Sequence, residues 1–277
     1  MATLIRYVRD LFNLPGVIRN LVRHRELIRV MTWRNFSARY RGSFGGLFWS
    51  VFQPMVMMVI YTVVFSLFLK VRFSTDASPF TFAVYLLCGL LPWQAFSEGV
   101  HTSAILIRAN ANLVKRVVFP LEILPVNLTL AAIIQQFIGM VLLVPLAWLV
   151  TGHLHVTLLF VPVILALQVL FSTGVNWIVA SLAVYLPDMG PLISLVLTAW
   201  MFLTPIFYPE DVVPPQAIII FRLNPMARLV NLYRNAFMIG LLPDLRDLLG
   251  TIGVCLLTFL VGYFWFMRLK KGFADVL

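Results

Sequence analysis

Five long stretches of this chain contain no Asp, Glu, Lys or Arg. They hold 28, 21, 65, 21 and 20 residues. They lie between Arg41 and Lys70, Asp76 and Glu98, Glu122 and Asp188, Asp188 and Glu210, and Asp247 and Arg268. Because a helix of about 20 apolar residues crosses the hydrocarbon core of a bilayer, four stretches hold one crossing each and the longest holds two. The sequence predicts an all-α, polytopic membrane protein with six transmembrane helices, over residues 44–69, 80–100, 123–149, 157–186, 190–208 and 249–267.

The composition agrees with a membrane protein. Hydrophobic residues make up 61% of the chain and charged residues 12%, about half of the roughly 25% charged residues of a soluble domain. In 277 residues, six helices and their loops leave no room for a separate soluble domain. Cys88 and Cys255 each fall within a predicted span, where we expect small packing residues and no metal site.

The distribution of basic residues predicts the orientation. An even number of spans places both termini on one side of the membrane. That side carries 15 of the 21 lysines and arginines, nine of them arginines in residues 1–41. Since basic loops stay in the cytoplasm during insertion, both termini are expected to be cytoplasmic. We therefore divide the chain into a cytoplasmic segment, 1–41, and a six-span domain, 42–277.

Residues 14–34 have the pattern of an amphipathic helix that lies at the cytoplasmic membrane surface. Apolar side chains recur at helical spacing along one face, with basic side chains mostly opposite, which favours the lipid interface. The alternative is a basic leader without a fixed position. The apolar face comprises Leu14, Val17, Ile18, Leu21, Ile28 and Met31, and the polar face carries Arg19, Arg23, Glu26 and Arg29.

The segment between the fifth and sixth spans, about 209–248, is too apolar for an ordinary external loop. Its apolar pieces are about ten residues long, too short to cross, and prolines interrupt them, which a helix interior does not tolerate. This pattern predicts either an external re-entrant hairpin or an interfacial loop packed on the bundle. Irregular backbone at membrane depth is found only where protein or a water-filled cavity surrounds it, so the hairpin would form a cavity or gate.

Four motifs, in order along the chain, resemble one family. They are Arg39-Tyr40-Arg41-Gly42-Ser43 with Leu47-Phe48-Trp49-Ser50 and Gln53-Pro54, then Thr204-Pro205-Ile206-Phe207-Tyr208-Pro209, then Asn224-Pro225-Met226 with Leu232-Tyr233-Arg234, and the ending Phe273-Ala274-Asp275-Val276-Leu277. The chain resembles the type-2 ABC exporter permeases that export O-antigen, capsule or teichoic-acid chains. The resemblance implies a homodimer of six-helix subunits that works with two copies of a separate ABC ATPase.

The lysines are consistent with an ATPase on another chain. A P-loop ends in Gly-Lys-Ser/Thr, where backbone amides and the lysine hold the phosphates. None of the four lysines here follows a glycine. We therefore expect no catalytic residues, no metal and no cofactor on this chain, and ATP and Mg on the partner subunit. The net charge of +10 is explained by cytoplasmic loops and anionic lipids, without nucleic acid.

In the family, the loop after the second span carries a short coupling helix that contacts the ATPase. The alternative is an ordinary basic cytoplasmic loop. The turn after the fourth span is a candidate for a second contact. The residues expected to couple to the ATPase are Arg108, Asn110, Asn112, Lys115, Arg116, Phe119 and Asp188.

Aromatic side chains are candidates for the substrate path, because flat sugar faces pack on rings. Packing and the enrichment of Trp and Tyr at membrane interfaces offer a simpler explanation for each of them. Buried amides such as Gln135, Gln136 and Gln168 are expected to join helices. The substrate-path candidates are Tyr61, Phe65, Phe68, Trp200, Phe207 and Tyr208. The external-gate candidates are Pro214, Pro215, Asn224, Pro225, Arg228 and Arg234.

The leading hypothesis is the membrane-spanning permease subunit of an ATP-driven exporter of lipid-linked polysaccharide, O-antigen above all, in the bacterial inner membrane. Seventeen arginines against four lysines are typical of a GC-rich genome and favour a lipopolysaccharide pathway. One alternative is a gradient-driven transporter, which places ionisable groups at mid-membrane, where the sequence indicates no ion pair. Another is a membrane-embedded transferase for lipid-linked sugars, which needs paired carboxylates or a histidine at an interface.

Overall fold

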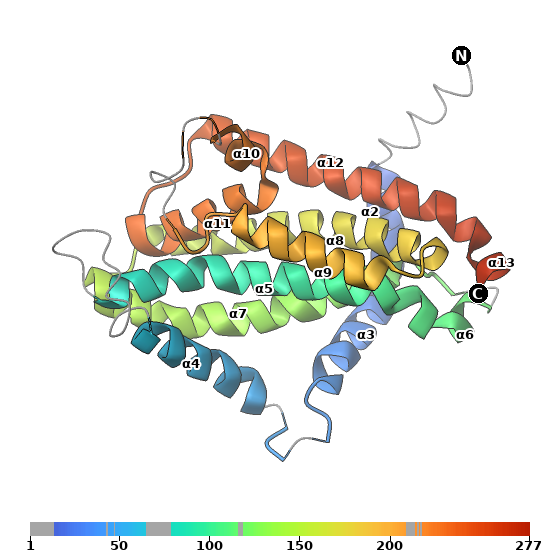
Figure 1. Cartoon of the computed structure of the whole chain (residues 1–277), viewed down its shortest axis with the longest axis horizontal. Helices are drawn as coiled ribbons and strands as arrows, with labels where there is room; N and C mark the ends of the chain where they lie inside the picture. Colours follow the sequence, from blue (N-terminus) through green and yellow to red (C-terminus); the bar gives the residue numbers. More distant parts are fainter. Residues whose placement is uncertain are drawn as a thin grey trace.

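The chain forms a bundle of helices in a computed structural model that describes residues 14–42, 44–46, 48–64, 79–115, 119–208, 214, 216 and 218–277. Every regular element in these residues is helical (Figure 1), which confirms the all-α prediction. The main helices are α2 (Leu14–Arg23), α3 (Arg25–Ala38), α4 (Phe48–Val63), α5 (Pro79–Ala109), α6 (Ala111–Val114), α7 (Ile123–Thr151), α8 (Val161–Tyr185), α9 (Met189–Phe202), α10 (Ile218–Leu223), α11 (Pro225–Arg234), α12 (Leu245–Leu269) and α13 (Phe273–Val276).

Four helical segments of the described chain are long and apolar enough to cross a membrane. They cover Phe80–Ala109, Ile123–Thr151, Val156–Tyr185 and Leu245–Val276, and they correspond to the predicted second, third, fourth and sixth spans. Phe48–Tyr61 and Met189–Phe202 are apolar but shorter; they correspond to the predicted first and fifth spans. Length and composition thus identify four candidate spans in the described residues, which is consistent with a polytopic membrane protein.

The ends of two helices differ from the prediction. Helix α5 continues to Ala109, well past the expected end at residue 100, so that part of the predicted cytoplasmic loop is helical. Helix α9 ends at Phe202 and is followed by turns and bends over 203–208, so the predicted end at residue 208 is wrong. Pro205 explains the earlier end, since proline disfavours helical backbone at the preceding residue and lacks an N–H donor.

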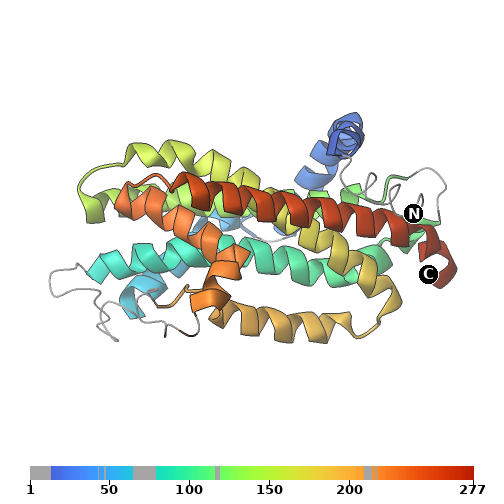
Figure 2. The same cartoon turned by 90° about the horizontal axis from the view of Figure 1, so that it is seen from above.

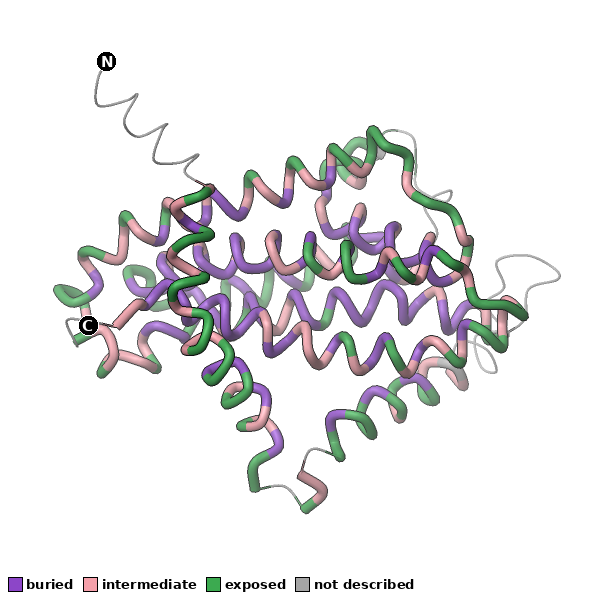
Figure 3. The backbone as a smooth tube through the Cα atoms, turned by 180° about the vertical axis from the view of Figure 1, so that it is seen from behind, coloured by how far each residue is buried: buried purple, intermediate pink, exposed green. Residues whose placement is uncertain are grey.

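Helix α8 lies at the centre of the bundle and packs most closely on α12. Gly174 of α8 and Gly262 of α12 allow the two backbones to approach, because a β-carbon at Gly262 would lie 2.2 Å from the Gly174 carbonyl oxygen. Small residues at such contacts are typical of membrane helix pairs. The buried residues of the structure follow α5, α7 and α8, whereas the outer helices are exposed along one side (Figure 3).

The amphipathic segment near the N-terminus is helical, as predicted, but in two pieces. Helices α2 and α3 are separated at His24, whose backbone leaves the helical region. Val17 and Met31 are buried against the bundle, and Leu14, Leu21 and Ile28 pack beside them. Ile18, expected on the same face, is 49% exposed. The apolar face is therefore present except at Ile18, but it packs on the helix bundle, whereas the pattern predicted contact with lipid.

The segment before the last span forms two short helices, α10 and α11, joined at Asn224. The Asn224 side chain caps α11 by accepting a hydrogen bond from the Met226 amide at 3.0 Å, and Pro225 occupies the first helical position, where proline is favoured. Helix α11 continues as a π-helix over Asn235–Ile239. It packs against α5, α8 and α12, and residues such as Met226, Leu229 and Tyr233 are fully buried.

The two ends of the bundle carry different elements. Helices α6 and α13 lie at one end, on the right of Figure 1, and α11 lies toward the other end. The view from above shows the same separation (Figure 2). Helices α3 and α4 diverge from the bundle, with residues 39–42 and 44–46, which lie between them in the sequence, at the lower edge of Figure 1.

Candidate functional site

A cavity of about 760 Å³ lies beside α4, α5, α7 and α9, next to the end of α3. Its wall mixes apolar side chains with polar ones, and three aromatic residues, Tyr40, Tyr61 and Trp93, take part in it. Such a mixture can hold a ligand with polar groups and flat apolar faces. The polar and charged side chains of the wall include Arg39, Gln53, Gln94, Glu98, Gln135 and Gln136.

An ion pair between Arg39 and Glu98 lies in the cavity wall. The guanidinium donates from Nη1 to Oε2 at 2.9 Å and lies 2.7 Å from Oε1 through Nη2. Two such contacts form the bidentate geometry of a strong arginine–carboxylate pair. The side chains remain 22% and 43% exposed. Sequence reasoning missed this pair because its members are 59 residues apart and Arg39 lies outside the predicted spans.

Polar contacts fasten the start of α4 to α7. Gln135 of α7 donates through Nε2 to the Ser50 carbonyl oxygen at 2.8 Å. Its Oε1 accepts a short hydrogen bond from the Tyr40 hydroxyl. One amide therefore joins the end of α3, the first turn of α4 and the middle of α7 at the cavity wall.

A second amide cluster links the cavity wall to α11. Gln136 of α7 and Gln168 of α8 exchange hydrogen bonds of 2.8 and 2.7 Å. The Tyr233 hydroxyl donates to Gln168 Oε1 at 2.7 Å, and Gln168 also donates through Nε2 to the Pro92 carbonyl oxygen of α5 at 3.0 Å. This confirms the expectation that buried amides join helices.

The predicted substrate-path residues occupy different places. Tyr61 lies in the cavity wall. Trp200 packs among Trp93, Phe96 and Phe171 and donates through Nε1 to Asn224 Oδ1 at 2.9 Å. Phe207 packs against the core and Tyr208 against Phe221. Phe65 and Phe68 lie outside the described residues.

Two of the predicted gate residues are tightly bound. Asn224 donates to the Leu203 carbonyl oxygen at 3.0 Å and to the Thr204 hydroxyl at 2.9 Å, so it joins α10 and α11 to the end of α9. Arg234 is 4% exposed; its Nη2 donates to the Ile206 carbonyl oxygen at 3.0 Å, and its guanidinium carbon lies 3.5 Å from the centre of the Tyr85 ring.

The other gate candidates are less enclosed. Arg228 donates through Nε to the Arg222 carbonyl oxygen at 2.8 Å, and Pro225 begins α11. Pro214 is exposed, and Pro215 lies outside the described residues. Asn224 and Arg234 therefore both bind residues 203–206, the segment that follows α9. Pro214 lies at the surface.

The predicted coupling residues lie at the end of the bundle that carries α6. Arg108, in the last turn of α5, donates to the Val184 carbonyl oxygen at 3.1 Å, near the turn that contains Asp188. Asn110 precedes α6, and Phe119 packs, partly buried, against the apolar core that includes Ile107, Ile123 and Phe266. Arg116 lies outside the described residues. Asn112, Lys115 and Asp188 are exposed.

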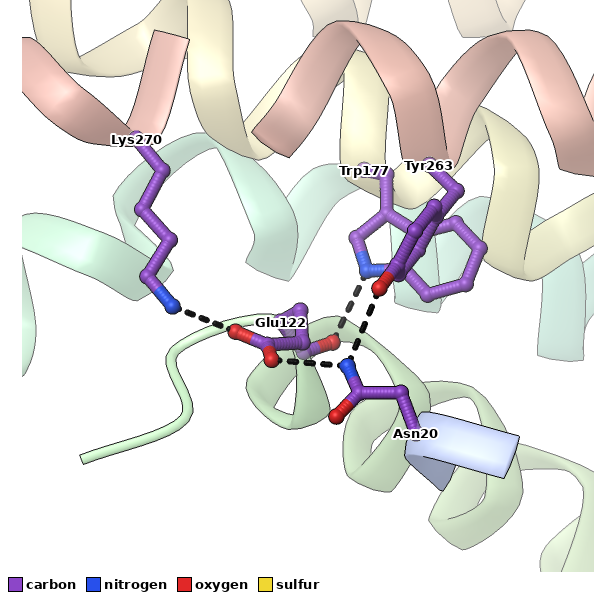
Figure 4. Close-up of polar contacts among 5 residues, drawn as sticks. All are labelled: Asn20, Glu122, Trp177, Tyr263 and Lys270. Carbon is purple, nitrogen blue, oxygen red and sulfur yellow. Dashed lines mark hydrogen bonds and ion pairs between the residues drawn. The ribbon is translucent and has the colours of Figure 1, made fainter. Parts of the chain in front are cut away.

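A polar cluster that sequence reasoning did not single out centres on Glu122 (Figure 4). Lys270 donates to its Oε2 at 2.6 Å and Asn20 to its Oε1 at 2.9 Å. Burial alone raises the pKa of Glu122, but the hydrogen bonds from Lys270 and Asn20 and the lysine charge outweigh it, so the pKa is lowered. Only the position of Glu122, at the start of a charge-free stretch, could have drawn attention to it.

Comparison with known proteins identifies the family. Residues 26–238 match the ABC-2 type transporter family. The chain is 29% identical to the "O-antigen export system permease protein RfbA" of Myxococcus xanthus, over 98% of this chain and 99% of that protein. It is 30% identical to a Klebsiella pneumoniae protein of the same description, over 91% and 95%. It is 26% identical to the "Polysialic acid transport protein KpsM" of Escherichia coli, over 79% and 85%. The chain therefore belongs to the ABC-2 type transporter family, as its motifs predict.

Proposed function

We propose that this chain is the permease subunit of an ABC exporter that moves lipid-linked polysaccharide, O-antigen in particular, out across the bacterial inner membrane. The observation that carries the proposal is the similarity to O-antigen export permeases over nearly the full length of both chains. The cavity supports it, because its amides can bind sugar hydroxyls and its rings can pack on sugar faces.

The proposed topology has six spans and cytoplasmic termini. Helices α4 and α9 would be two further spans in addition to the four long ones. Residues 1–41 would form the cytoplasmic segment and residues 42–277 the membrane domain. The end of the bundle that holds α6 and α13 would face the cytoplasm, which agrees with the basic residues there. Helices α10 and α11 would form a re-entrant hairpin on the external side, and the burial of α11 supports this arrangement.

We further propose that two copies of the chain assemble with two copies of an ABC ATPase, which would bind ATP and Mg. In this proposal, the second copy of the chain contacts the outward sides of α4 and α9. Their outward side chains are large, apolar and uncovered in the single chain, as in Met55, Val59, Leu195 and Phe202. Such extended apolar faces mark contacts with lipid or protein. Placing them together would close the cavity from its open side.

The ATPase would act on the end of the bundle that carries α6. In this proposal Asn110, Asn112, Lys115 and Arg116 contact the ATPase, and Arg108 and Phe119 hold the segment against the bundle. Asp188 would make a second contact from the turn before α9. ATP-driven movement would then reach α9, which borders the cavity.

The glycan would pass through the cavity toward the external hairpin. Tyr61 contributes a ring to the wall, and in this proposal Phe65 and Phe68, which follow it in the sequence, also contact the glycan. At the outer end Trp200, Phe207 and Tyr208 would support the gate formed by the hairpin. Asn224 and Arg234 would hold the gate to α9, with Pro214, Pro215, Pro225 and Arg228 shaping its ends.

Purification from the native membrane tests this function. We expect an ATP-binding subunit to accompany the chain in mild detergent. We also expect deletion of the gene to remove O-antigen from the cell surface, while lipid-linked O-antigen accumulates inside the cell. A preparation without a nucleotide-binding partner, even after gentle cross-linking, would contradict the proposal. So would normal surface O-antigen in the deletion strain.

A gradient-driven transporter is the second candidate, favoured by the ion pair between Arg39 and Glu98 in the cavity wall. Ionisable groups inside a membrane protein often mark ion pathways. Transport in vesicles separates the two mechanisms. An exporter driven by ATP continues when a protonophore removes the proton gradient and stops with vanadate, whereas a gradient-driven transporter shows the reverse.

A further inference from the structure

We propose that Glu122, Asn20 and Lys270 act as positioning residues that join the ATPase-facing loop to the N-terminal and C-terminal helices, so that the three segments move together during export. This inference rests on the proposed function. It concerns neither the cavity nor the hairpin but the polar cluster around Glu122, whose members come from four helices or their ends (Figure 4).

The contacts converge on one carboxylate. Lys270, directly after α12, reaches Glu122 Oε2 at 2.6 Å, and Asn20 of α2 reaches Oε1 at 2.9 Å. The same Asn20 amide donates to the Tyr263 hydroxyl of α12 at 2.9 Å. Trp177 of α8 donates to the Glu122 carbonyl oxygen at 2.8 Å. Both carboxylate oxygens and the backbone carbonyl of one residue thus bind three different helices or their ends.

The position of Glu122 along the chain gives these contacts their significance. Residues 110–122 connect α5 to α7 and contain α6, the segment proposed to contact the ATPase. Glu122 is the last residue of this connection, immediately before α7 begins at Ile123. A displacement of α6 therefore reaches Glu122 before it reaches the membrane part of α7, and the side-chain bonds pass it to α2 and to the end of α12.

Burial makes the junction sensitive to the loss of one member. The Glu122 side chain is 5% exposed and that of Lys270 26%. Removing one partner of a buried pair leaves the other charge without compensation. Trp177, which binds the Glu122 backbone, is fully buried and packs on Phe259 and Tyr263 of α12. The cluster is therefore seated on rigid core packing.

Export and ATP hydrolysis, measured on the full transporter with its ATPase, test the proposal. We expect Lys270→Gln to lower export about five-fold or more while the ATPase still assembles and hydrolyses ATP. Lys270→Arg keeps the charge and should retain export. Lys271→Gln is the matched control, because Lys271 is the next residue, is exposed and contributes no atom to the cluster. Export equal to the wild type in Lys270→Gln would overturn the proposal.

A double-mutant cycle separates a shared junction from two independent defects. Glu122→Gln and Lys270→Gln remove opposite sides of one ion pair. The export rate of the double variant should therefore be no lower than that of the single variant with the lower rate. Multiplied losses would overturn the inference. If Glu122→Gln does not accumulate in the membrane, Asn20→Leu replaces it in the cycle, since Asn20 is only half-buried.

A distance measurement tests the joint movement itself. Spin labels are placed at Ala111→Cys in α6, a half-buried position outside the proposed ATPase contacts, and at the exposed Ala274→Cys in α13, while the native cysteines are buried. In the wild type we expect the distance within one subunit to stay constant when ATP is added, and in Lys270→Gln to change. A distance that responds to ATP equally in both proteins would overturn the inference. A failure of the proposed function is recognised separately, because no ATPase would then bind the wild type.

Discussion

Gly262 of α12 lies directly against the backbone of Gly174 in α8. A β-carbon at Gly262 would stand 2.2 Å from the Gly174 carbonyl oxygen, and one at Gly174 would stand 2.4 Å from the Thr258 carbonyl oxygen. The obstacles are backbone atoms, which cannot rotate aside as side chains do. The contact therefore requires glycine on both helices.

Replacing Gly262 by alanine should separate α8 from α12 and destabilise the protein by about 1–3 kcal/mol, the cost typical of overpacking. Thermal unfolding of the purified protein in detergent measures the effect. Gly253→Ala is the control in the same helix, because a β-carbon there meets nothing within 4 Å, and we expect it to be neutral or slightly stabilising. Equal melting of the two variants would contradict the close-contact explanation.

Asn224 is a second position where the residue type is specified by its contacts. Its oxygen accepts hydrogen bonds from Met226 and Trp200, and its nitrogen donates to Leu203 and Thr204. Asn224→Asp keeps the acceptor but loses both donors, and it places a carboxylate beside the Leu203 carbonyl oxygen. We expect it to destabilise the protein more than Asn224→Ala, whose loss of the cap costs about 0.5–2 kcal/mol.

Limited proteolysis between α9 and α11 should follow the same order, with the aspartate variant cut fastest. Asn112→Asp is the control, since Asn112 is exposed in α6, at the other end of the bundle from α11. If the aspartate and asparagine proteins are cut at equal rates, the two donated hydrogen bonds do not hold α11 to α9.

Arg234 and Tyr85 together hold the segment after α9. Arg234 donates to the Ile206 carbonyl oxygen, and the Tyr85 hydroxyl donates to the Tyr208 carbonyl oxygen at 3.0 Å. Lysine cannot reproduce both the ring stacking and the planar donor group. We expect Arg234→Lys to expose the segment, with a loss of about 2 kcal/mol for the desolvated cation–π contact.

The reaction of a cysteine introduced at Phe207 with a charged thiol reagent measures this exposure. Arg228→Lys is the matched control, because the hydrogen bond from Arg228 to the Arg222 carbonyl oxygen lies at the surface. The rate should rise in Arg234→Lys and stay unchanged in Arg228→Lys. An unchanged rate in both would show that Arg234 does not fix the segment.

Acid should weaken the Glu122 cluster. The pKa of Glu122 is lowered from its ordinary value of 4.5 in the folded protein, so the unfolded state binds more protons as the pH falls. Its contribution to the free energy of unfolding is complete above pH 4.5 and is lost as the pH falls through the folded pKa. Melting curves from pH 7 to pH 3 should therefore show a steeper acid loss in the wild type than in Glu122→Gln. Glu26→Gln, at an exposed glutamate, should keep the wild-type slope.

The sequence predicted those parts of the fold that depend on local composition. The charge-free stretches located the apolar helices, and the helical pattern around Val17 and Met31 located the N-terminal amphipathic segment. The break at His24 could not be predicted in this way, because both neighbouring turns have the same pattern. The early end of α9 could have been predicted from Pro205, whose effect on the preceding helix is local.

The site depends on contacts that have no local pattern. Arg39 meets Glu98 and Lys270 meets Glu122 across 59 and 148 residues, and a sequence gives each charge without its partner. Trp200 illustrates the same limit. The sequence places it on one face of a helix, but it does not show that three other aromatic rings pack around it. The family motifs bridged part of this gap, since Asn224 and Arg234 lie in motifs and make close contacts.

In the proposed six-span topology, the shortness of α9 has a consequence for the surrounding lipid. Its 14 residues rise about 21 Å, whereas the hydrocarbon core of a bilayer is about 30 Å thick. A bilayer that meets a short apolar helix becomes thinner around it. Since α9 borders the cavity, a hydrated chain that travels beside it would have a shorter insulating layer to cross than it would anywhere along α7, α8 or α12.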